Sequence, residues 1–159
     1  YRKSRGVVVK DFLAGKKLKK LLNEYKLENI EPFTMIIVDW NNGLIFKELL
    51  WDGKERKISK LPLKEHIWSS SPLYSEAMKD LRRKWFENLK ESRGFSADTL
   101  LDFHQNAGEG NSESDLIIDR GFLKTQSITQ IHNTARGLKF WHKNLINNEI
   151  TEEHIQFRA

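Results

Sequence analysis

The sequence predicts an α+β fold in which helices are layered on mainly antiparallel sheets. Two short helical segments come first, and strand-like segments joined by tight-turn signals follow them. A short strand, two longer helical segments and an alternating hairpin complete the order. Runs of strands separated from runs of helices are typical of this class. No repeat and no shift in composition marks an internal boundary, so we expect a single domain over residues 1–159.

The composition is that of a globular protein. The chain has 159 residues, 38% of them hydrophobic, which is enough to build a core. No apolar run is long enough to span a bilayer, and no signal peptide is visible, so a cytoplasmic location is expected. The absence of cysteine excludes disulfides, thiolate zinc sites and a cysteine nucleophile within these residues.

Two short helices are expected at the start, over residues 7–13 and 16–27, with Gly15 between them. The densest basic cluster of the chain lies in the second one, whose leucines recur at helical spacing. This pattern favours the solvated face of an amphipathic helix over a nucleic-acid site, despite the net charge of +5. We therefore expect no nucleic-acid partner.

The next segment predicts a three-stranded antiparallel meander. The near-continuous apolar run FTMIIVD (33–39) is typical of a strand buried on both faces. Asn41-Asn42-Gly43 predicts a hairpin turn, 44–51 the returning strand, Asp52-Gly53 a second turn, and 55–61 a more polar third strand.

The stretch HIWSSSPLY (66–74) poses a choice between a nucleophilic serine and a helix start. A nucleophile elbow needs glycines around the serine, and none flank Ser69 or Ser70. Ser71 before Pro72 instead matches an N-cap followed by proline at the first helical position. Capping is therefore the preferred interpretation, after a short strand over 66–69.

Two longer helices are expected over 74–90 and 95–106, the second capped by Ser96. In the first, the charged residues are expected outside: Lys79, Asp80, Arg82, Arg83 and Lys84. In the second, one face is expected to carry Ala97, Leu100, Leu101 and His104. A hairpin of 125–132 and 137–145 follows, and the tail beyond it has no clear period.

No catalytic or metal-binding spacing stands out among the polar residues. The five histidines are scattered, although His132 and His142 could face each other across the last hairpin. The acidic residues of 107–115 lack the order of a calcium loop, and no glycine-rich phosphate loop or serine–histidine–acid spacing occurs. From the residues alone, this is an α+β domain without a catalytic motif.

Seven segments in one order carry a family resemblance that covers nearly the whole chain and weakens after Asn144. They are SRG with DFL (4–13), EPFTMIIVD (31–39), LLWDG (49–53), HIWSSSPLY (66–74), RRKWF (82–86), LLDFH (100–104) and KTQSITQI (124–131). In this order the chain resembles bacterial members of the NRDE family, which are related to the transport and Golgi organisation protein family of eukaryotes.

The resemblance implies part of an N-terminal-nucleophile-hydrolase-like αββα sandwich. Family members typically begin Met-Cys and have an Asn-Arg-Asp-Glu stretch soon after. Neither occurs here, and the phenol of Tyr1 cannot replace the thiol. The chain is thus expected to be the C-terminal two-thirds of a member. The whole protein would hydrolyse a non-peptide amide bond, whereas no catalytic residue carries over to this chain.

The family also implies an alternative: a haem- or lipid-related binding or trafficking module without catalysis. A haem site needs an axial ligand beside an apolar slot. The residues to test are His66 beside Trp68, and His142 beside Trp141. Haem is then a ligand rather than a required cofactor, and otherwise the partner is a small molecule of unknown identity. A third hypothesis is an interaction domain with no small-molecule chemistry.

Overall fold

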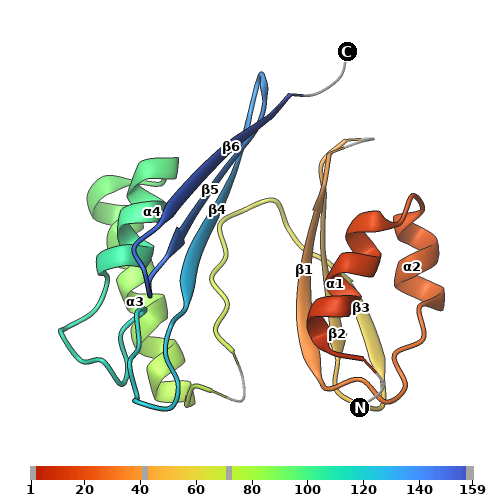
Figure 1. Cartoon of the computed structure of the whole chain (residues 1–159), viewed down its shortest axis with the longest axis horizontal. Coiled ribbons are helices and arrows are strands. Elements are labelled where there is room, and N and C mark those ends of the chain that lie inside the picture. Colours follow the sequence, from red (N-terminus) through yellow and green to blue (C-terminus); the bar gives the residue numbers. More distant parts are fainter. Residues whose placement is uncertain (1–2, 41–42, 71–72, 157–159) are drawn as a thin grey trace. The chain divides into compact units, whose positions relative to one another are not determined.

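The computed structural model describes residues 3–40, 43–70 and 73–156. The chain forms two compact units, Tyr1–Glu65 and His66–Ala159, each with one antiparallel sheet and helices packed on it (Figure 1). The helices are α1 (Arg5–Ala14), α2 (Leu18–Glu24), α3 (Glu76–Arg93) and α4 (Ala97–Asn106). The strands are β1 (Phe33–Asp39), β2 (Ile45–Trp51), β3 (Arg56–Lys60), β4 (Ser127–Thr134), β5 (Gly137–Asn144) and β6 (Ile150–Gln156). The predicted α+β class is confirmed.

The first sheet is the predicted meander, in the order β1-β2-β3. Its second turn forms because Asp52 Oδ1 accepts hydrogen bonds from the backbone N–H groups of Lys54 and Glu55, both at 2.7 Å, while Gly53 takes a φ of +98°. In the first turn, Gly43 has a φ of +86°, and Asn41 and Asn42 lie outside the described residues.

The core of this unit lies between the helices and one face of the sheet. Trp51 at the end of β2 packs with Val8 of α1 and with Leu27 and Ile30 of the segment that leads into β1. The indole Nε1 donates a 3.0 Å hydrogen bond to the carbonyl oxygen of Ile30. The Trp51 ring is therefore packed in the core, and its one polar group, the indole N–H, has a hydrogen-bond acceptor.

The apolar run of β1 predicted a strand buried on both faces, and this prediction is wrong. None of its residues is fully buried, and Val38 is 42% exposed. In the register, Phe33 pairs with Trp51 and so lies on the helix-covered face, whereas Val38 pairs with Phe46 on the other face. The helices of the unit cover only one face of the sheet, and a continuous apolar run does not show which face is covered.

Helix α2 is shorter than predicted because backbone carbonyl groups at its C-terminal end accept hydrogen bonds from a side chain of the sheet. The guanidinium of Arg56 in β3 donates to the carbonyl oxygens of Leu22, at 2.8 Å, and of Tyr25. Carbonyls at a helix end that gain such a partner need no further helical turn. Tyr25 accordingly has extended backbone angles.

The second sheet has three strands, in the order β4-β5-β6, whereas the sequence predicted only the hairpin of the first two. The tail without a clear period forms β6, which pairs antiparallel with β5 from Lys143↔Ile150 to Gly137↔Gln156. Every residue of β6 is exposed. An edge strand with both faces in solvent has no alternation of apolar and polar residues to reveal it.

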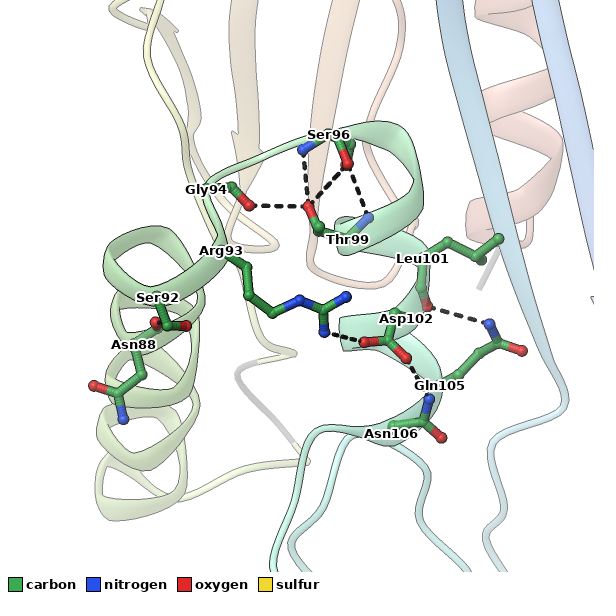
Figure 2. Close-up of polar contacts among 10 residues, drawn as sticks. All are labelled: Asn88, Ser92, Arg93, Gly94, Ser96, Thr99, Leu101, Asp102, Gln105 and Asn106. Carbon is green, nitrogen blue, oxygen red and sulfur yellow. Dashed lines mark hydrogen bonds and ion pairs between the residues drawn. The ribbon is translucent and has the colours of Figure 1, made fainter.

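The junction between α3 and α4 contains the predicted N-cap, Ser96 (Figure 2). Gly94 ends α3 with a φ of +67°, and Ser96 and Thr99 form a reciprocal capping box at the start of α4. Arg93 also forms an ion pair with Asp102, at 2.5 Å, which ties the end of one helix to the side of the next.

The predicted start of α3 is wrong. Ser71 and Pro72 lie outside the described residues, but the helix begins at Glu76 and its N-cap is Ser75, whose Oγ accepts a hydrogen bond from the N–H of Met78. The expected strand over 66–69 is wrong too, since these residues have no regular secondary structure. A strand needs a partner, and none of the described strands pairs with this stretch.

Two side chains lie on unexpected faces of these helices. Arg82, expected in solvent, is 4% exposed. In α4 the buried residue is Phe103, at 5% exposure, whereas His104 is exposed. Phe103 packs edge-on against Phe86 of α3, 5.7 Å between ring centroids. The contact with α3 therefore sets which face of α4 is buried.

Candidate functional site

The candidate ligand residues His66 and Trp68 lie together in the stretch before α3. Their rings are stacked, 5.1 Å between centroids and 24° between planes. The imidazole is half-buried, whereas the indole is 42% exposed. The pair offers an aromatic surface beside a nitrogen donor, which is the combination expected for a planar ligand.

The third candidate, His142, lies in β5. It pairs with Thr129 of β4, whose Oγ1 is 2.8 Å from the imidazole Nδ1. The ring is stacked on Phe140, two residues earlier on the same face, with 6.4 Å between centroids. A hydrogen bond at Nδ1 orients the ring, and Nε2 is then the ring nitrogen left to bind a ligand.

The predicted meeting of His132 and His142 is wrong. His132 pairs with Lys139, whereas His142 pairs with Thr129. Because these pairs are three rungs apart and side chains alternate along a strand, the two imidazoles lie on opposite faces of the sheet. His132 instead shares its rung with Lys139 and with His154 of β6.

The structure does not bring the candidates into one metal site. Among residues 3–40, 43–70 and 73–156, no group of three or more histidine, aspartate or glutamate side chains could hold a metal ion. The carbonyl of Ser70 accepts the N–H groups of Leu73 and Tyr74, which is a turn role.

A polar network in the first unit could not be predicted from local spacing in the sequence. Asp11 of α1 accepts hydrogen bonds from the hydroxyl of Tyr25, at 2.5 Å, and from Lys3 Nζ, at 2.8 Å. Lys3 also lies over the Tyr25 ring, 5.6 Å from its centroid. The three residues are 8 to 22 positions apart, so no local motif could have revealed them.

The pKa of Tyr25 is raised, first by its partial burial and then by its hydrogen bond to Asp11, which together outweigh the opposing effect of Lys3. A phenol whose folded pKa lies above its unfolded value contributes stability below that unfolded value, about 10, and loses it as the pH rises through the folded pKa.

We therefore expect Tyr25 to titrate above the ordinary tyrosine value. The measurement is the tyrosinate absorbance of the native protein minus that of Tyr25→Phe, followed from neutral to alkaline pH. The stability advantage of the native protein over Tyr25→Phe should also shrink above pH about 10. A difference titration with a midpoint below that value would mean that Lys3 dominates.

Each sheet has a second face that the unit's own helices leave uncovered. In the first sheet this face carries Ile36, Val38, Phe46 and Leu50. In the second it carries Ile131, Leu138, Phe140 and Ile155, together with His142. Val38, Leu50, Ile131 and Ile155 are between 37% and 59% exposed. The periodicity of the sequence did not reveal these faces.

The chain matches no protein-family model, no curated protein and no solved structure. Among the described helices, none combines the length and the apolar character needed to cross a membrane.

Proposed function

We propose that this chain is part of an NRDE-family protein with an N-terminal-nucleophile-hydrolase-like αββα sandwich. The observation that carries the proposal is the layering within each unit. Both antiparallel sheets have helices on one face and apolar side chains on the other. A sheet in an αββα sandwich needs both surfaces, because it packs against a helical layer on one side and a second sheet on the other.

The helix-covered faces are built alike. In the first unit, Trp51 and Leu49 point to the helices and are 6% and 1% exposed. In the second, Ile128 and Trp141 are each 9% exposed, and Gln130 Nε2 donates a 2.7 Å hydrogen bond to the carbonyl of Ala97 at the start of α4. The apolar residues of the opposite faces supply the surface that a second sheet would cover.

The activity that this assignment favours is hydrolysis of a non-peptide amide bond. In the N-terminal-nucleophile mechanism, the side chain of the first residue attacks the carbonyl and its own α-amino group serves as the base. The 159 residues contain no cysteine, so the thiol would come from outside them and this chain alone would not be catalytic. The absence of cysteine also suits a reducing cytoplasmic compartment.

The test uses the protein encoded by the complete reading frame. Hydrolysis of a panel of non-peptide amides is compared before and after Cys→Ala at a Met-Cys start. We expect the change to remove the activity, by a factor of about 10³ or more, since no second nucleophile would replace the thiol. Activity that survives the change, or a reading frame without that start, would contradict the hydrolase proposal.

The alternative is a haem-binding module, favoured by the stacking of His66 on Trp68 and by the fixed imidazole of His142. Titration with haemin should then give a saturable Soret shift that His66→Ala or His142→Ala abolishes. His132→Ala is the matched control, because His132 is exposed on the opposite face of the same sheet. Absence of a saturable shift, or equal loss in the control, would exclude this function.

A further inference from the structure

A hollow of about 510 Å³ opens beside α2 in the unit Tyr1–Glu65. Its walls are formed by the α1–α2 connection, the helix and the residues that follow it. The lining residues are Gly15, Lys16, Lys17, Lys20, Leu21, Glu24, Tyr25 and Lys26. Sites for small molecules commonly have volumes of about 300 to 1,000 Å³, so this hollow is of suitable size.

Lysines predominate among the residues that line the hollow, and their alkyl chains contribute to its surface. Four of its lining residues are lysines, and its single carboxylate, Glu24, already forms a 3.7 Å ion pair with Lys20. Within the part of the chain that the structure describes, Lys16 and Lys17 have no ion-pair partner. Residues 1–65 contain 15 Lys and Arg against 9 Asp and Glu, whereas the remainder has 12 against 13. The net positive charge of the chain therefore belongs to the unit that carries the hollow.

Close packing fixes the shape of the hollow. A Cβ atom on Gly15 would lie 2.3 Å from Leu21 Cδ1, so the absence of a side chain lets the connection approach the helix. Arg56 also donates hydrogen bonds to the carbonyls of Leu22 and Tyr25, and the Tyr25 hydroxyl donates one to Asp11. These contacts set the walls without a ligand, which lowers the entropic cost of binding.

We propose that this hollow binds a small molecule that carries a polyphosphate group. Lysine ammonium groups bind phosphate oxygens as point charges, and several lysines around one concavity match a multiply charged anion. The side of Leu21 and the ring of Tyr25 add an apolar wall for the rest of the molecule. The inference is independent of the family assignment and of the hydrolase proposal.

A nucleic-acid strand fits these observations less well. The lysines surround one hollow, whereas a strand is bound along an extended groove with several aromatic rings for its bases. Here Tyr25 is the only aromatic residue among those that line the hollow. The densest basic cluster of the sequence consists of Lys16, Lys17, Lys19 and Lys20, and all of these except Lys19 line the hollow.

The test is calorimetric titration of the chain with sodium tripolyphosphate at low ionic strength. The variant Lys16→Ala/Lys17→Ala removes two lining charges, while the control Lys19→Ala/Lys57→Ala removes two exposed charges of the same unit outside the hollow. We expect affinity to fall about tenfold or more in the first variant and by less than about twofold in the control. Circular dichroism checks that both variants fold.

Three outcomes would overturn the proposal. The native chain could show no saturable binding. Both double variants could weaken tripolyphosphate binding equally, which would mean that only the net charge attracts the anion. A single-stranded oligonucleotide could bind much more tightly than tripolyphosphate, with a steep salt dependence that the Lys19→Ala/Lys57→Ala control reduces as strongly as the lining variant. A loss confined to Lys16→Ala/Lys17→Ala supports the proposal.

Discussion

Replacement of Arg82 by alanine is expected to lower the free energy of unfolding by about 3 kcal/mol. Arg82 lies in α3 and is 4% exposed, although it is charged. Its Nη2 donates hydrogen bonds to the carbonyl oxygens of Asp115, at 2.6 Å, and of Ser114, at 3.1 Å. Its guanidinium lies over the ring of Tyr74, 3.6 Å from the centroid.

The cost is large because the alanine variant leaves both carbonyls without their charged donor and removes the cation–π contact with Tyr74. It also opens a space beneath the loop that follows α4. Arg82→Met separates these effects, since methionine fills much of the volume but donates no hydrogen bond. We expect it to cost somewhat less than alanine, about 2 kcal/mol.

Arg83→Ala is the matched control for the Arg82 experiment. Arg83 is the next residue of the same helix, exposed, and paired with Asp80 at the surface, so its loss should cost at most about 1 kcal/mol. The measurement is urea denaturation followed by circular dichroism. Equal effects of the two alanine variants would contradict the role of Arg82 as the anchor of the Ser114–Asp115 segment.

Replacement of Trp51 by alanine should destabilise the protein by about 4 kcal/mol, within the range for a large buried aromatic side chain. Trp51 is 6% exposed and joins β2 to the core formed by Val8, Leu27 and Ile30. The change creates a cavity between the sheet and its helices, and it leaves the Ile30 carbonyl without its indole donor.

Trp51→Phe keeps most of the packing and removes the Nε1–H group, so about 1 to 2 kcal/mol is expected. Leu50→Ala is the control, because Leu50 is adjacent in β2, lies on the other face and is 37% exposed. Its loss should cost less than about 1 kcal/mol. Denaturation is again followed by circular dichroism, which avoids the fluorescence change caused by loss of a tryptophan. If Leu50→Ala destabilised the protein as much as Trp51→Ala, the assignment of the core to the Trp51 face of the sheet would be contradicted.

Local signals in the sequence were sufficient to predict an element where nearby residues cap it or form the turn that ends it. The bounds of β1 were predicted to the residue, Asp52-Gly53 forms the expected turn, and Ser96 caps α4 as expected. Caps and tight turns depend on residues three or four positions apart, which a sequence displays directly.

The candidate site was harder to predict. His66 and Trp68, two positions apart, were named together as candidates, but the stacking of their rings was not predicted. The environment of His142 could not be predicted, because it depends on the register between β4 and β5. The hollow beside α2 was visible in the sequence only as a basic cluster, since its concavity arises from the close approach of Gly15 to Leu21.

The sequence by itself determined the α+β class, the order of most elements and the excess of positive charge in the first 65 residues. Tertiary structure alone decided that Arg82 is buried, that His132 and His142 lie on opposite faces, and that the tail adds β6 as an edge strand. The physical reason is range. Each of these three outcomes depends on a partner supplied by a distant segment or a neighbouring strand, and neither periodicity nor propensity encodes which partner arrives.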